Sequence, residues 1–110
     1  MQFGMPTLIE NNTIKENIAL CKKLKLNFIE LNMNFPEYQV EQLENWKLFY
    51  ELAEKNQIYY TIHLDENLNI ADFNPLVRNA CLETVRRVIE VAKNFVSLKN
   101  RFGDATQSLI

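Results

Sequence analysis

Glycine, cysteine, proline and histidine are all scarce in this chain, which has two, two, three and one of them among 110 residues. No glycine-rich loop follows the expected first strand, which argues against a nucleotide phosphate site. Cys21 and Cys81 lie far apart in the sequence and do not have the spacing of metal ligands. We therefore expect two buried free thiols, as is usual for cysteine in a reducing cytoplasm.

Long apolar runs and an excess of basic charge are also missing. No stretch approaches the roughly 18 apolar residues that a membrane span requires. The chain does not begin with a basic segment followed by an apolar one, so we expect no signal peptide. The net charge of −2 argues against a broad basic surface, and nucleic acid is not expected as a partner. With 47% hydrophobic and 24% charged residues, the composition is that of a soluble globular protein, which we expect to be cytoplasmic.

The hydrophobic period switches repeatedly between strand-like and helix-like spacing. Strands are expected over residues 2–6, 27–33 and 58–64, and helices over 13–24, 40–55 and 74–94. Thr13 and Glu16 form a capping-box pattern, and Asn74 followed by Pro75 is a strong helix start. This β-α-β-α-β-α order predicts a parallel sheet with right-handed crossovers. Periodicity alone leaves two architectures open, a doubly wound sheet and the first part of a β/α barrel.

Polar side chains at the expected strand ends are the candidates for chemistry. His63, the only histidine, lies at the carboxyl end of the third strand, where ligands bind in α/β folds. The alternative is a structural histidine that bonds the adjacent loop. Glu30 shares a strand face with Asn32, and its carboxylate needs a partner or a wet cavity. Its alternatives are a salt bridge to a neighbouring strand or an exposed edge. Asn67 follows the His63 strand and is expected to face the same pocket.

Other charged residues are interpreted as solvated. Residues 65–69 lack the spacing and the glycine of a calcium loop, so we expect their side chains to cap turns. Arg78, Arg86 and Arg87 lie on the third expected helix and are read as its exposed face rather than a phosphate site. Glu83 is expected to pair with Arg87 one turn away.

Two segments carry a family resemblance. They read NFIELNMNFP, and YYTIHLDENLNIADFNP followed by the helix LVRNACLETVRRVIEVAKN. They resemble the xylose-isomerase-like TIM-barrel superfamily, which holds sugar and sugar-phosphate isomerases and epimerases and the apurinic endonuclease IV-like enzymes. The matching features are the strand FIEL at 28–31, His63, the pair Asn67–Leu68, and Pro75 near the start of a helix. The resemblance covers residues 1 to about 94.

The resemblance implies the first three β/α units of a (β/α)8 barrel over residues 1–94, followed by a divergent tail over 95–110. It implies a pocket at the top of the barrel for a sugar or sugar phosphate, with Glu30, Asn32, His63 and Asn67 as substrate contacts. It also implies a divalent metal (Mn, Mg, Co or Zn) in the complete enzyme. In the isomerases the metal ligands and the two catalytic glutamates come from later strands, so this chain is expected to hold no catalytic residue. In endonuclease IV-like members the residue matching His63 is a zinc ligand.

The chain also departs from the family pattern. Lys25 and the pair Asn56–Gln57 stand where glycine is common. A left-handed conformation would cost such residues about 1 kcal/mol, which another turn geometry would avoid. After Asn94 the pattern fails, since residues 96–98 could start a strand but no helix is expected to follow.

The length leads to an expectation about activity. A barrel typically takes about 250 residues, so we expect a broken piece of a longer enzyme that is inactive alone and self-associates through open sheet edges. The non-enzymatic alternative is a small α/β interaction module that uses its sheet edge.

Overall fold

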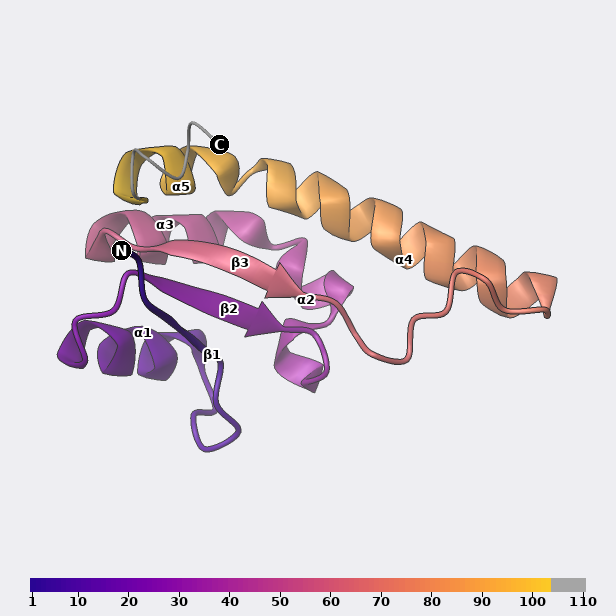
Figure 1. Ribbon diagram of the computed structural model, residues 1–110, viewed down its shortest axis with the longest axis horizontal. Helices are drawn as coiled ribbons and strands as arrows, with labels where there is room; N and C mark the ends of the chain where they lie inside the picture. The colour runs from indigo at the N-terminus through magenta and orange to yellow at the C-terminus, as the bar shows by residue number, and fades with distance from the viewer. Residues whose placement is uncertain (104–110) are drawn as a thin grey trace.

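The computed structural model describes residues 1–103, which form three strands, a short 3-10 helix and five α-helices (Figure 1). In chain order these are β1 (Gly4–Pro6), α1 (Ile14–Lys23), β2 (Phe28–Asn32), η1 (Pro36–Tyr38), α2 (Val40–Leu43), α3 (Trp46–Asn56), β3 (Tyr59–His63), α4 (Pro75–Lys93) and α5 (Val96–Phe102).

The three strands form one parallel sheet in the order β1-β2-β3, so each strand pairs with the strand before it in the sequence. Met5 is in register with Ile29, and Ile29 is in register with Tyr60. The predicted mixed α/β class with a parallel sheet is therefore confirmed.

One face of the sheet carries the core. Ile29 and Leu31 of β2 are 0% exposed, whereas Phe28, Glu30 and Asn32, which alternate with them, are only half-buried. On the covered face α1 packs against β2 and α3, and α3 and α5 pack against β3. Tyr60 shows this packing directly, because its hydroxyl donates to the Phe49 carbonyl of α3 at 2.8 Å.

Both predicted helix starts are confirmed. The Thr13 hydroxyl accepts a hydrogen bond from the Glu16 amide at 3.2 Å, and the Glu16 carboxylate accepts from the Asn12 amide at 3.2 Å. At α4 the Asn74 side chain accepts from the Leu76 amide at 3.0 Å. Each of these bonds pairs a backbone N–H that the helix itself leaves unbonded.

The two helix-to-strand turns do adopt the left-handed conformation, with φ of 58° at Lys25 and 57° at Gln57. After α1, the Leu26 amide donates to the Cys21 carbonyl at 2.9 Å. After α3, the Ile58 amide donates to the Ala53 carbonyl at 3.1 Å. These are the bonds of the Schellman motif, which requires a left-handed residue at the helix end. The alternative turn geometry is not used.

The expected helix over residues 40–55 is wrong in one respect, because it breaks at Glu44 and Asn45 into α2 and α3. Leu43 and Phe49 are both buried. Leu43 and Phe49 are six residues apart, so in one continuous helix their side chains would point in directions about 120° apart. The break lets both side chains enter the same core.

A second difference concerns residues 96–98, which belong to helix α5 and not to a strand. Phe95 and Leu98 are buried in the core, at a spacing that a helix places on one side. Arg101 of α5 pairs with Glu54 of α3 at 2.6 Å. Residues 104–110 of the expected tail lie outside the described residues.

Helix α4 projects past the carboxyl ends of the strands (Figure 1). Arg87 joins it to α2 through an ion pair with Glu44, so the expected pairing of Arg87 with Glu83 is wrong, and Glu83 pairs with Arg86 instead. Within residues 1–103 no helix is long and apolar enough to cross a membrane.

Candidate functional site

Four polar residues lie together on the sheet face that the helices leave uncovered. Glu30 is in register with Thr61, and Asn32 is in register with His63. Neighbouring strands are about 4.8 Å apart, so these side chains form a patch two strands wide that runs from the middle of β2 and β3 to their carboxyl ends. We call Glu30, Asn32, Thr61 and His63 the open-face patch. The structure thus brings together three of the four expected site residues, together with Thr61.

His63 is exposed and makes one local contact, with its Nδ1 2.8 Å from the Leu64 carbonyl oxygen. A carbonyl can only accept, so the proton of the neutral ring lies on Nδ1 and Nε2 carries the lone pair. The contact to the adjacent loop is the structural role considered from the sequence. It also leaves Nε2 able to accept a hydrogen bond from a ligand.

Glu30 is half-buried, and its carboxylate has no ion pair or hydrogen bond to any residue of the described chain. The Thr61 hydroxyl beside it is buried and has no hydrogen-bond partner among residues 1–103. A buried hydroxyl without a partner is uncommon. The Glu30 carboxylate is therefore the group with unused bonding capacity on the open face, and the Thr61 hydroxyl in the next strand is covered from solvent.

Asn32 is partly committed to local structure. Its side-chain oxygen accepts from the Asn34 amide at 2.9 Å, and its own backbone amide donates to the Thr7 hydroxyl at 3.1 Å. The amide nitrogen of its side chain is the group that can donate to a ligand.

Asn67 lies outside the patch, exposed on the loop after β3. Its backbone amide donates to Asp65 at 2.8 Å, and Gln39 donates to the same carboxylate at 3.0 Å. These bonds, led by the Asn67 amide, hold the pKa of Asp65 below its ordinary value. Asp65 therefore anchors the loop, as expected for the solvated stretch 65–69.

The described residues do not form a metal site. No three side chains of His, Cys, Asp or Glu within residues 1–103 come close enough to hold an ion. A zinc or calcium site needs more protein ligands than Glu30 and His63 supply. For the Mn, Mg, Co or Zn implied by the resemblance, residues 1–103 hold no cluster of three such ligands.

The sequence reasoning missed a second polar cluster, centred on the fully buried Asn17. Its side-chain oxygen accepts from the Leu8 amide at 3.0 Å, and its nitrogen donates to the Tyr38 hydroxyl at 3.0 Å. The cluster shapes the loop after β1. The signal was present, since Asn17 interrupts the apolar stripe between Ile14 and Cys21.

Thr61 was missed as a site residue for a different reason. The strand alternation places it on the same face as His63, but a threonine in a strand is ordinary. Only the structure shows that its hydroxyl has no partner in the described chain.

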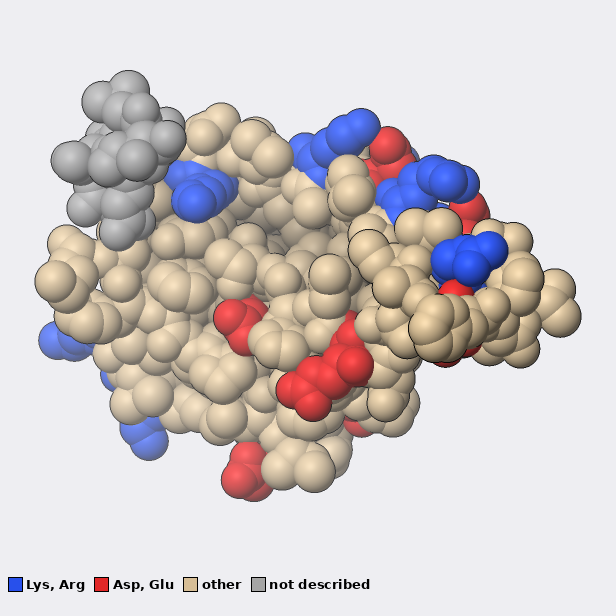
Figure 2. Space-filling view, turned by 45° about the vertical axis from the view of Figure 1, so that its right-hand side comes forward, with Lys and Arg blue, Asp and Glu red and all other residues tan. Residues whose placement is uncertain are grey.

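The charge on one side of the molecule is sparse. In Figure 2 most of the visible face is uncharged, with basic side chains spread around its margin and acidic ones near the middle, below it and among the basic ones at the upper right. No broad basic surface is seen in this view.

Comparisons with protein-family models, with curated proteins and with solved structures found no match.

Proposed function

We propose that this chain is the N-terminal part of a β/α barrel similar to the xylose-isomerase-like sugar isomerases and epimerases, and that the open-face patch lies on the wall of its sugar pocket. The observation that carries the proposal is the placement of the patch on the uncovered face, with Asn32 and His63 at the carboxyl ends of β2 and β3 and Glu30 at the middle of β2. In a β/α barrel that face is the interior, and its carboxyl end is where substrates bind.

The topology supports a barrel over a doubly wound sheet. The strands follow one another in the order β1-β2-β3 and the helices pack on a single face. A doubly wound sheet reverses its strand order and carries helices on both faces. A barrel adds its parallel strands one after another in sequence order and keeps all its helices on the outer face.

The chemistry of the patch suits a ligand rich in hydroxyl groups. The Glu30 carboxylate and His63 Nε2 accept hydrogen bonds, and the Asn32 amide nitrogen donates them. A sugar needs both kinds of partner, because each of its hydroxyls donates and accepts. Sugar or sugar phosphate is therefore the substrate class we infer.

We expect this chain to bind and not to turn over substrate. Moving a proton between adjacent carbons requires a positioned acid–base pair and stabilisation of the developing charge. The patch supplies one carboxylate, Glu30, and no metal site. A cytoplasmic location is part of the proposal, since Cys21 and Cys81 are both free and buried.

We do not propose the endonuclease IV-like zinc hydrolase. Asp65 and Glu66 lie two and three residues after His63 and would repel the phosphates of a nucleic acid.

Backbone amide NMR of the labelled chain, titrated with a ketose phosphate, tests the proposal. We expect shifts at Glu30, Thr61 and His63, and we expect Glu30→Gln to weaken binding about tenfold by replacing a charged acceptor. Glu51→Gln, an exposed change on α3 that covers the other face of the sheet, is the matched control and should leave binding unchanged. Shifts confined to other surfaces, or none at high ligand concentration, would refute the sugar pocket.

A further inference from the structure

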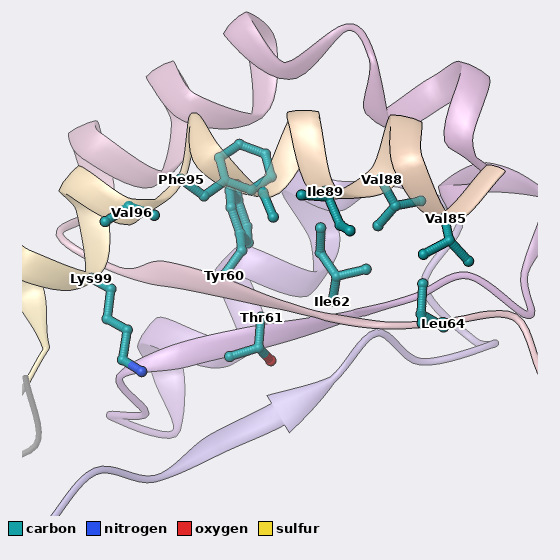
Figure 3. Close-up of a pocket in the computed structure, with 11 residues that line it drawn as sticks. Tyr60, Thr61, Ile62, Leu64, Val85, Val88, Ile89, Phe95, Val96 and Lys99 are labelled. Carbon is teal, nitrogen blue, oxygen red and sulfur yellow. The ribbon is translucent and has the colours of Figure 1, made fainter. Parts of the chain in front are cut away.

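An apolar groove of about 440 Å³ runs between strand β3 and helix α4 (Figure 3). It is lined by Tyr60, Ile62 and Leu64 from the strand and by Val85, Ile89 and Ala92 from the helix. Val85 and Ile89 point from the helix toward Ile62 and Leu64 in the close-up. The groove also reaches Thr61, whose side chain belongs to the opposite face. It therefore follows the edge of β3 and does not lie over one face alone.

The edge of β3 offers backbone bonding capacity to this groove. The Tyr59 amide donates to the Asn27 carbonyl, and the His63 carbonyl accepts from the Met33 amide, so alternate residues of β3 bond to β2. In a strand successive residues turn their backbone groups to opposite sides. Tyr60 and Ile62 therefore turn their N–H and C=O groups toward the groove, where no strand of the described chain pairs with β3.

Helix α4 leaves part of its apolar surface exposed. Its Val88 and Val91 are buried in the core, but Ile89, which lines the groove, is 52% exposed and Leu82 is 39% exposed. An apolar helix side next to an unpaired strand edge fits an extended segment. Its backbone would bond to β3 and its alternate side chains would pack under α4.

A positive charge at one end of the groove restricts which segment can bind there. Lys99 of α5 lines the groove, and its side chain extends beside the first half of β3 (Figure 3). It has no ion pair with any acidic residue among residues 1–103. Charge complementarity selects a segment with a carboxylate at this end.

We propose that the groove binds a single extended strand of another polypeptide, with apolar residues at alternate positions and an acidic residue beside Lys99. A second folded copy is the poorer occupant, because symmetric pairing of two β3 edges would bring both α4 helices over the same groove. The other sheet edge is less suited to pairing, since β1 has three residues and ends in Pro6. In the β/α barrel proposed above, the same edge of β3 would pair with the next strand, so the bound segment takes the place of that strand. The sugar pocket lies on the open face and is tested separately.

The test is fluorescence anisotropy of a labelled synthetic peptide titrated with the full chain. The peptide carries one glutamate followed by alternating threonine and valine, and a second peptide replaces the glutamate with lysine. We expect saturable binding of the first and about tenfold weaker binding of the second. Lys99→Glu should reverse this preference while circular dichroism shows an unchanged fold.

Two isoleucine variants test the apolar wall. Ile89→Gln removes an exposed apolar side chain in the groove and should weaken peptide binding about tenfold. Ile9→Gln is the matched control, because Ile9 is 78% exposed in the β1–α1 loop, and it should have no effect.

Three outcomes overturn the proposal. They are the absence of saturable peptide binding, equal binding to wild type and Ile89→Gln, and no response to the Lys99→Glu charge reversal. Sedimentation of the unliganded chain adds a fourth. If the chain forms a dimer that Ile89→Gln disrupts and Ile9→Gln does not, the groove belongs to a second copy.

Discussion

Two side chains occupy a backbone conformation that glycine would adopt at lower cost. Lys25 and Gln57 each end a helix in the left-handed region, with φ of 58° and 57°. Both conformations are held by Schellman hydrogen bonds and by the buried strands that follow, so the packing of the whole unit outweighs the local preference. A sequence rule based on glycine alone could not locate these turns.

We expect Lys25→Gly and Gln57→Gly each to raise the free energy of unfolding by about 0.5–1 kcal/mol, because glycine removes the Cβ strain at positive φ. Urea denaturation measures the change. Lys22→Gly, inside α1, should instead lower stability by about 1 kcal/mol. A loss of stability in both turn variants would mean that the left-handed conformations are incorrect.

The buried Asn17 contributes to the stability of the fold through the hydrogen bonds of its side chain. We expect Asn17→Ala to destabilise the chain by about 2–3 kcal/mol, since it leaves the Leu8 amide and the Tyr38 hydroxyl without their partner. Asn79→Ala, an exposed asparagine of α4, should change stability by less than about 0.5 kcal/mol. Thermal unfolding of both variants makes the comparison. Equal effects would show that the buried cluster contributes nothing.

At the scale of the element, sequence reasoning succeeded where hydrophobic period and caps agreed. The three strands, the capped starts of α1 and α4, and the alternation of β2 were all predictable from local pattern. The break between α2 and α3 was not, because it depends on where Leu43 and Phe49 meet the core. Helix α5 was missed because residues 96–98 were interpreted as the possible start of a strand, whereas Phe95, Leu98 and Phe102 have the spacing of one side of a short helix.

Helix α5 makes a testable contribution. Leu98 is 0% exposed, and we expect Leu98→Ala to lower the free energy of unfolding by about 2–4 kcal/mol by leaving a cavity. Val96→Ala, at an exposed position of the same helix, should cost less than about 0.5 kcal/mol. Chemical denaturation compares the two. A small effect of Leu98→Ala would place α5 outside the cooperative core.

At the scale of the whole molecule, the single helical layer decides where chemistry can occur. It covers Ile29 and Leu31 and leaves Glu30 and His63 on the other face. The alternation of β2 and the position of His63 predicted three members of the open-face patch. The groove beside β3 could not be predicted, because it arises from the position of α4 relative to a strand edge, and no local pattern reports that distance.

The core also sets the response of the whole molecule to alkaline pH. Burial raises the pKa of the Cys21 thiol above its ordinary 9.0, and burial raises the pKa values of Tyr38 and Tyr60 above 10.0. The folded state therefore holds these protons more tightly than the unfolded state. Its stability is complete below pH 9 and falls as the pH rises beyond 9 and then 10.

Urea denaturation between pH 8 and 11 measures this decline. Tyr60→Phe removes one of the titrating groups, so we expect its stability to fall less steeply with pH than that of the wild type, even if its stability at pH 8 is lower. Parallel pH profiles for the two proteins would contradict the assignment to Tyr60.

The consecutive order of the strands has a consequence for how the chain acquires its shape during synthesis. Each strand finds its neighbour among residues already made, since Ile29 pairs with Met5 and Tyr60 pairs with Ile29. A chain leaving the ribosome can therefore add β/α units one at a time, without waiting for a distant segment. Translation-arrested chains in which β2 has just cleared the ribosomal exit tunnel should already protect the β1–β2 pairing from proteolysis.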